Sequence, residues 1–346
     1  MSEGEYQLKV LIPSQLDQFL SEGYLVVENV ISLSTIDDLF DEMNRQVLDK
    51  IAEDLVKQNL IDQTYSHLPL CDRIQLICRI SKRTYPQYFD FSLPQSDIMN
   101  DTPLYLGDKL FNVMRNKNLI DVVSDILGTN EISSNPVQHM RMKLPQNITN
   151  TIAANFSGMV NAVPWHQDNG VILPEADNSN ILTCWLALTD VTLNSGCMQV
   201  IPKSHRTNDG IIQHCPTREG LAISGHLIDS LASSDCQLLK PLPLPMTAGS
   251  VLLMNQRTVH SSLENTTENR VRISMDLRYQ KTGTNSGRPL FETAGFVVRS
   301  ELNQRLELCN STIWAQNWLE LREKLANERL QTKQFNRWDI NALGCA

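Results

Sequence analysis

The segment at residues 270–279 constrains the fold more than any other part of the sequence. Five apolar residues alternate there with five polar ones, the apolar ones being Val271, Ile273, Met275, Leu277 and Tyr279, and the polar ones Arg270, Arg272, Ser274, Asp276 and Arg278. Successive side chains of a β-strand point to opposite faces of the sheet. The segment therefore predicts a strand with one apolar and one polar face.

Short segments of the same kind make up the chain from about residue 131 onward. Residues 137–144 also alternate with a period of two and are stopped by Pro145. Further strands are predicted at residues 181–188, 197–201 and 251–255, separated by turns at residues 194–196 and 247–250. Many short strands at this spacing are typical of a β-sandwich or barrel.

Helical patterns dominate the two ends of the chain. A short helix at residues 16–22 is expected to run into a strand at 23–27, and Ser34 or Thr35 to cap the next helix. Further helices are predicted at residues 50–85, at 107–127 with Gly128 as its end, and at 302–325. We expect the aromatic tail at residues 335–339 to dock on the body of the protein.

Composition excludes several classes of protein. The net charge is −9 and no run of basic residues is present, which argues against nucleic-acid binding and favours a small-molecule partner. The longest apolar runs are too short to cross a bilayer, and residues 1–6 carry acids where a signal peptide has a basic region. We therefore expect a cytoplasmic protein that is not in a membrane. Its eight cysteines show no framework spacing, so reduced thiols are expected.

Three residues have the chemistry of a metal site. His166 and Asp168 stand two residues apart, so that in a strand both would point to one face, and His260 follows the predicted strand at 251–255. Two histidines and one carboxylate on one face of a metal leave other coordination positions open, as in non-haem Fe(II) oxygenases. Each residue alone is more often a hydrogen-bonded or surface residue than a ligand, so the interpretation depends on the set.

A candidate anion clamp strengthens that interpretation. Arg272 and Ser274 lie on the strand predicted after His260, and both point to the same face of that strand. An arginine offers a rigid, bidentate fork for a carboxylate such as the distal one of a 2-oxoacid. Arg270 and Arg278 have the same parity as Arg272, so the residue pattern leaves the choice among the three open, and surface salt bridging is the alternative role.

The sequence resembles the phytanoyl-CoA dioxygenase family of Fe(II)- and 2-oxoglutarate-dependent oxygenases. The resemblance extends over most of residues 15–290 and depends on motifs in the family's order and spacing: residues 23–27, Pro164-Trp165-His166-Gln167-Asp168, residues 185–190, residues 194–206, and Gly249-Ser250-Val251 followed by His260-Ser261-Ser262 and Asn265. The family's arginine would fall at Val271, so one residue is inserted or deleted here. We favour Arg272 over Arg270 because Ser274 stands where related oxygenases often have a hydroxyl.

The resemblance implies a mainly β fold with flanking helices, a double-stranded β-helix or cupin-like jelly roll. We expect one oxygenase domain over residues 1–346, with a mainly helical part at 1–130, the jelly-roll core at 131–290 and a helical extension at 291–346. The resemblance to the family also implies that His166, Asp168 and His260 are iron ligands. Arg272, Ser274 and Ser262 are expected around the cosubstrate, and Trp185 either there or as an ordinary core aromatic. Gln138 and Met140 are pocket candidates whose more common role is packing in the sheet, whereas His205 and Arg206 are expected to be structural.

The implied activity uses Fe(II), 2-oxoglutarate and O2 to hydroxylate a small-molecule metabolite, or to desaturate or cyclise it, with release of succinate and CO2. Related halogenases lack the carboxylate ligand, so Asp168 argues against halogenation, and Gln167 and Asn169 become candidates for the substrate side of the metal. The alternative is a non-catalytic jelly-roll protein that binds a metal or ligand.

The substrate is less constrained than the reaction. Residues 146–162 and 207–245 lie between the framework strands and are expected to cover the mouth of the site. No coenzyme A or nucleotide pocket is evident, so we expect a small polar metabolite or biosynthetic intermediate. The sequence predicts neither the position of oxidation nor the oligomeric state.

Overall fold

A computed structural model describes residues 6–152, 161–206, 211–217, 220–225, 228, 240–328, 337–338 and 345. The helices are α1 (Pro13–Glu22), α2 (Leu33–Met43), α3 (Asp49–Lys57), α4 (Leu70–Ser81), α5 (Pro86–Phe89), α6 (Asp108–Met114), α7 (Lys117–Leu127), α8 (Gln146–Thr149) and α10 (Ser311–Asn327). The strands are β1 (Tyr24–Val27), β2 (Ile132–Ser134), β3 (His139–Lys143), β4 (Leu182–Ala187), β5 (Met198–Val200), β6 (Cys215–Thr217), β7 (Gly220–Ala222), β8 (Leu242–Leu244), β9 (Val251–Asn255), β10 (His260–Ser262), β11 (Arg272–Lys281) and β12 (Phe296–Arg299).

Seven strands form the largest of three antiparallel sheets among the described residues, the smallest being the pair β6-β7. Its order is β1-β9-β4-β11-β2-β12, and β3 also pairs with β11. Strand β11 is the long central strand: it pairs with β4 along one edge and with β3 and then β2 along the other. The predicted strand at residues 270–279 is thus the centre of the sheet.

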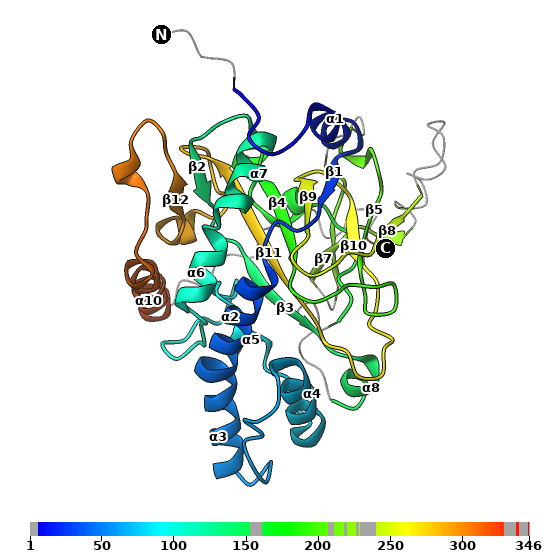
Figure 1. Ribbon diagram of the computed structural model, residues 1–346, viewed down its shortest axis with the longest axis vertical. Helices are drawn as coiled ribbons and strands as arrows, with labels where there is room; N and C mark the ends of the chain where they lie inside the picture. Colours follow the sequence, from blue (N-terminus) through cyan, green and yellow to red (C-terminus); the bar gives the residue numbers. More distant parts are fainter. Residues whose placement is uncertain are drawn as a thin grey trace.

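A smaller sheet, in the order β10-β5-β8, faces the larger one. Apolar side chains from both sheets pack together between them, among them Trp185 and Leu252 from the larger sheet and Met198 and Val200 from the smaller. Helices α6, α7 and α10 lie on one side of β11, and β5, β8 and β10 lie on the other (Figure 1). Two facing antiparallel sheets with flanking helices form the predicted jelly roll, which is confirmed.

The two faces of β11 have different partners. Its apolar residues, such as Ile273 and Leu277, belong to the large core that includes the helices, and the strand is buried on both faces along nearly its whole length. Its polar face therefore points into the space between the sheets rather than to solvent. Burying charged side chains costs free energy unless they are paired or bind a ligand. The buried polar face of β11 therefore indicates a functional site between the two sheets.

Several element boundaries differ from those expected. Helix α2 is capped by Ser32, whose hydroxyl accepts from the Thr35 N–H, and not by Ser34 or Thr35. The helix expected at 107–127 is two helices, because the side chain of Asn116 caps a new start at Lys117. Gly128 ends α7 in the left-handed conformation, as predicted.

The C-terminal part differs from expectation in two ways. Residues 291–346 are not only helical, because β12 pairs with β2 at the edge of the larger sheet. The helix expected to begin at residue 302 begins at Ser311, where Asn310 caps it. The expected division of the chain into parts at residues 1–130, 131–290 and 291–346 stays a prediction. In the part of the chain that the structure describes, none of the helices is long and apolar enough to cross a membrane.

The expectation of reduced cysteines is wrong for one pair. Cys215 and Cys345 form a disulfide, with 5.3 Å between their Cα atoms. They are 130 residues apart in sequence, so no local spacing could indicate the bond. Among the described residues, Cys71, Cys78, Cys184, Cys197 and Cys309 are free.

Candidate metal centre

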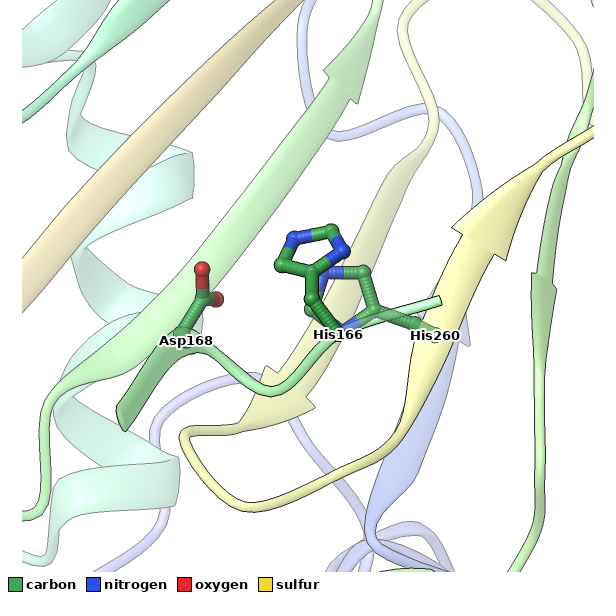
Figure 2. Close-up of side chains that lie close together, drawn as sticks. All are labelled: His166, Asp168 and His260. Atoms are coloured by element: carbon green, nitrogen blue, oxygen red, sulfur yellow. The ribbon is translucent and has the colours of Figure 1, made fainter. Parts of the chain in front are cut away.

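His166, Asp168 and His260 come together between the two sheets. His166 extends the smaller sheet by pairing with His260, each donating its N–H to the other's carbonyl at 2.9 Å. Asp168 lies just beyond this extended segment, at the start of a short 3-10 helix over Asp168–Val171. It is therefore a turn and not a continuous strand that brings the carboxylate towards the two rings (Figure 2).

The geometry of the three residues suits one metal ion. Each offers one ligand atom, and these atoms all lie within 4.8 Å of one another. Asp168 and His260 are each only 3% exposed and His166 is partly buried, so the cluster lies inside the protein. Figure 2 shows the three side chains converging on one space.

Hydrogen bonds fix the orientation of both imidazoles. Nδ1 of His166 lies 2.8 Å from the Pro164 carbonyl, and Nδ1 of His260 lies 2.9 Å from the Thr258 carbonyl. A carbonyl oxygen only accepts, so each Nδ1 carries the proton and each Nε2 keeps its lone pair. This is the arrangement by which proteins prepare histidine as a metal ligand.

The protonation states also suit a cation. Burial, followed by the neighbouring His260, lowers the pKa of His166 to about 3, so its ring is neutral near pH 7. Burial alone would raise the pKa of Asp168, but the charge of the Arg278 guanidinium outweighs it, helped by the hydrogen bond from Thr183, and the pKa is lowered. The centre therefore presents neutral imidazole and an ionised carboxylate, as metal binding requires.

Two residues from the larger sheet hold the Asp168 carboxylate. Nη2 of Arg278 donates to its Oδ1 at 2.5 Å, and the hydroxyl of Thr183 donates to its Oδ2. The two residues are paired across β11 and β4. Arg278 is thus not a surface salt bridge, the alternative considered for it, but a buried partner of a candidate metal ligand.

Arg272 lies in the same cavity as the three candidate ligands. It is 1% exposed, and its Nη1 donates to the Ser274 hydroxyl at 2.7 Å. Its guanidinium lies over the ring of Trp185, 5.2 Å from the ring centre. Burial lowers its pKa to about 10, so it remains charged near pH 7.

This guanidinium forms no ion pair with any carboxylate of the described residues, and its Nε has no hydrogen-bond partner. A buried charge in this state is unfavourable unless a ligand completes it. The distal carboxylate of a 2-oxoacid has the charge and the planar geometry to do so. Arg270, the other candidate, is exposed and precedes β11, outside the lining of this cavity.

The remaining predicted site residues lie in different places. Ser262 accepts from Lys143 Nζ at 2.6 Å and lines a neighbouring cavity of about 490 Å³. Met140 packs in the helix-side core, and Gln138 donates to the Ser134 hydroxyl, so neither lines the cavity of the cluster. His205 and Arg206 both contact the Leu20 carbonyl, in agreement with a structural role.

The loops that were expected to cover the site are partly within the described residues. Residues 161–165 line the larger cavity, with Gln146, Thr149 and Asn150 from α8 and the turn after it. Residues 153–160 and most of 207–239 lie outside the described part of the chain. The predicted docking of the tail is visible at Trp338, whose indole N–H donates to the Gly170 carbonyl at 2.7 Å.

Sequence reasoning missed the basic side chains of β3. The register places Arg141 opposite Ser274 and Lys143 opposite Arg272, so both share the polar face of β11. Arg141 pairs with Asp276 inside the cavity. Burial, followed by the charges of Arg272 and Arg141, lowers the pKa of Lys143 to about 5. The alternation at residues 137–144 was the available signal, but only the strand pairing shows what it faces.

A buried cluster of two histidines and an aspartate inside a jelly roll is typical of non-haem iron proteins, and an arginine without an ion-pair partner among the described residues lies beside it, as a 2-oxoacid would require. The family model for phytanoyl-CoA dioxygenase (PhyH) matches residues 19–274, which is more than half of the chain. The protein belongs to the phytanoyl-CoA dioxygenase family of non-haem Fe(II)- and 2-oxoglutarate-dependent oxygenases.

Proteins of a plant and of a mammal are similar to this chain. A phytanoyl-CoA dioxygenase of Arabidopsis thaliana is 23% identical over 277 residues, which cover 74% of this chain and 84% of that protein. The phytanoyl-CoA dioxygenase domain-containing protein 1 of Bos taurus is 22% identical over 275 residues, covering 74% and 85%. Among solved structures, the apo form of the non-haem monooxygenase ThoJ matches with a TM-score of 0.55 and 14% identity, covering 92% of this chain and 100% of that one. At that identity the structural likeness supports the fold alone.

Proposed function

We propose that this protein is an Fe(II)- and 2-oxoglutarate-dependent dioxygenase that hydroxylates a small-molecule metabolite, or desaturates or cyclises it, with release of succinate and CO2. The observation that supports this most is the buried guanidinium of Arg272, which has no ion-pair partner among the described residues and lies in the same cavity as His166, Asp168 and His260. A metal site used only for structure does not need a free cation beside it. A cosubstrate with a carboxylate does.

The roles of the residues follow from their contacts. His166, Asp168 and His260 would hold the iron on one side and leave its other positions to ligands. Arg272, held by Ser274 and Trp185, would orient the distal carboxylate of 2-oxoglutarate. When bound, iron and 2-oxoglutarate supply with O2 the oxidising power that breaks a C–H bond.

Asp168 bears on the type of oxidation. Its carboxylate is present, ionised and fixed by Arg278 and Thr183, so it would occupy a coordination position of the metal. Halogenases of related type lack this group, and we therefore infer hydroxylation-type chemistry and not halogenation.

We further infer a small polar substrate, such as an intermediate of biosynthesis. The cavity of about 490 Å³ adjoins the centre, since Val163 lines both cavities. Hydroxyl and amide side chains dominate its wall, including Gln146, Asn161 and Gln199. Such a wall offers hydrogen bonds to a polar molecule rather than a surface for a long apolar chain.

Succinate formation tests the proposal. Purified protein is incubated with Fe(II), 2-oxoglutarate, ascorbate and air, with and without pools of polar metabolites. Succinate is expected in the wild type, increased by the pool that contains the substrate, and absent in His166→Ala and Asp168→Ala. A folded wild type that formed no succinate under any of these conditions would favour the non-catalytic binding protein instead.

A further inference from the structure

The loop that carries Asp168 is held by a segment that lies far from it in sequence. Nε2 of His214 accepts a hydrogen bond from the backbone N–H of Gln167 at 3.0 Å, and the Ile212 N–H donates to the Gln167 side chain at 2.7 Å. Gln167 stands between the candidate ligands His166 and Asp168. Residues 212–214 therefore fix the backbone and the side chain of the residue between two ligands.

The close packing of His214 on this loop depends on a glycine. A Cβ atom added to Gly170 would lie 2.2 Å from atoms of the His214 ring. The imidazole thus rests directly on the backbone two residues after Asp168. No other residue type leaves room for it without moving the ring.

The C-terminal tail contacts Asn169 and Gly170, the two residues that follow Asp168. Trp338 stacks on the His214 ring, with 5.1 Å between ring centres, and its indole N–H donates to the Gly170 carbonyl at 2.7 Å. Nη1 of Arg337 donates to the Asn169 carbonyl at 2.8 Å. The tail therefore satisfies the carbonyl groups of both Asn169 and Gly170.

Arg337 is itself fixed by a bidentate ion pair. Its Nη1 and Nη2 donate to the two carboxylate oxygens of Asp177 at 2.8 and 2.7 Å. The same carboxylate accepts from the side chain of Asn169 at 2.9 Å. Bidentate pairs with a third donor are the more rigid kind of ion pair, so Arg337, Asp177 and Asn169 form one unit beside Asp168.

A covalent bond joins the two holding segments to each other. Cys215 is adjacent to His214 and is bonded to Cys345 of the tail. A tie of this kind keeps the tail close to the loop, so that re-docking after any opening is an intramolecular event at high effective concentration. Without it, the docking would depend, among the described residues, on the contacts of Arg337 and Trp338.

We propose that His214, Arg337 and Trp338 are positioning residues for the metal ligand Asp168, and that the Cys215–Cys345 disulfide keeps them in place. The proposal rests on the proposed iron-dependent function, because it assigns a role towards the metal. None of the three residues touches the metal or the reacting atoms in this scheme. They act by holding residues 167–170 in the conformation that presents the carboxylate to the two imidazoles.

Reduction should remove the covalent bond between the tail and the segment that carries His214. Two electrons and two protons from dithiothreitol convert the Cys215–Cys345 disulfide into two thiols, while dithiothreitol becomes its cyclic disulfide. The hydrogen bonds of Arg337 and Trp338 then have to hold the tail without the covalent tie.

The test uses the full-length protein with the variants Trp338→Ala, Trp338→Phe and Cys345→Ser. Cys309→Ser is the matched control, because Cys309 is an exposed, free cysteine away from the loop. Hydrogen–deuterium exchange of the peptide over residues 166–172 is measured without metal, and Mn²⁺ affinity is measured by calorimetry as a stand-in for Fe(II). Exchange is repeated in the presence of dithiothreitol.

Trp338→Ala and Cys345→Ser should exchange about tenfold faster in this peptide and bind Mn²⁺ about tenfold more weakly, the size of effect typical of groups behind metal ligands. Trp338→Phe, which keeps the ring but loses the N–H donor, should be intermediate, and Cys309→Ser should match the wild type. Dithiothreitol should make the wild type exchange like Cys345→Ser and leave Cys345→Ser unchanged.

Wild-type exchange and wild-type Mn²⁺ affinity in Trp338→Ala would overturn the proposal. A wild type that bound no Mn²⁺ would instead contradict the proposed function. The exchange data would still decide whether the tail holds the loop, so the two failures are distinguishable.

Discussion

Arg278 on β11 donates a hydrogen bond of 2.5 Å to the carboxylate of Asp168, and the pair is almost fully buried. The guanidinium compensates the charge of a candidate metal ligand from the side of the central strand, while Thr183 holds the other oxygen from β4. The polar face of β11 thus connects the most regular pattern in the sequence with the metal centre.

Replacing Arg278 should weaken metal binding. Arg278→Met leaves the Asp168 carboxylate buried without its cation, and we expect the affinity for Fe(II) to fall by about 10- to 100-fold. The same change should destabilise the metal-free protein by about 3–5 kcal/mol, because one partner of a buried pair is lost. Anaerobic calorimetry and chemical denaturation measure the two effects. Arg270→Met, at an exposed position, is the control, and equal affinities in the two variants would count against the role of Arg278.

Replacing Arg272 should affect the cosubstrate and not the metal. Arg272→Ala removes the only buried guanidinium of this cavity that lacks an ion-pair partner among the described residues. We expect KM for 2-oxoglutarate in the succinate assay to rise at least about 30-fold, equivalent to about 2 kcal/mol for a charged hydrogen bond, with Fe(II) affinity little changed. Arg272→Lys should recover only part, because a lysine lacks the bidentate fork. Arg270→Ala should behave as the wild type; a larger effect there than at Arg272 would reverse the assignment.

Lys143 should make stability depend on pH. Burial, then the charges of Arg272 and Arg141, lowers its pKa in the folded protein to about 5, whereas an unfolded lysine titrates near about 10.4. Between these values the unfolded state binds the extra proton, so the contribution of Lys143 to the free energy of unfolding rises with pH. The expected slope is at most about 1.4 kcal/mol per pH unit.

Denaturation of the wild type and of Lys143→Met between pH 6 and pH 9 checks this prediction. The wild type should gain stability relative to the variant as the pH rises. A stability difference that stays constant over the range would mean that Lys143 is protonated in the folded protein.

Asp125 should anchor the beginning of the chain. Its buried carboxylate accepts the backbone N–H groups of Lys9, Val10 and Leu11, each at 2.8 Å. Asp125→Ala leaves all three donors without this partner, and the expected loss is about 3 kcal/mol in the free energy of unfolding. Asp17→Ala, a change at an exposed carboxylate of α1, serves as the control in the same denaturation experiment. Equal stabilities of the two variants would contradict the prediction.

The sequence was sufficient to predict the elements whose pattern is local. The alternation at residues 270–279 identified β11 because both of its faces are chemically uniform, and Gly128 identified the end of α7 because few other residues adopt its conformation readily. The break between α6 and α7 was missed because apolar residues continue at helical spacing on both sides of the polar run at residues 115–118, where Asn116 caps a new helix. The side chain of Asn116 accepts hydrogen bonds from the backbone of the next helix, and only the structure shows that these bonds start a new helix at this point.

For the site, sequence reasoning proposed the triad and Arg272, and the structure brings these four residues into one cavity. The partners of Asp168 could not be predicted, because the pairing of Arg278 with Thr183 depends on the register between β11 and β4. The contacts of His214 and Trp338 with the loop depend on segments that meet only in the folded chain. Pairings between distant segments carry no periodic signal in a single sequence.

Metal-dependent binding of 2-oxoglutarate tests the central claim most directly. Calorimetry under nitrogen, with 2-oxoglutarate titrated into wild-type protein with and without Fe(II), measures it before any turnover. We predict saturable binding of one 2-oxoglutarate per chain that requires Fe(II) and is lost in His166→Ala. Binding that was independent of Fe(II), or no binding by a folded wild type, would contradict an iron centre that works with this cosubstrate.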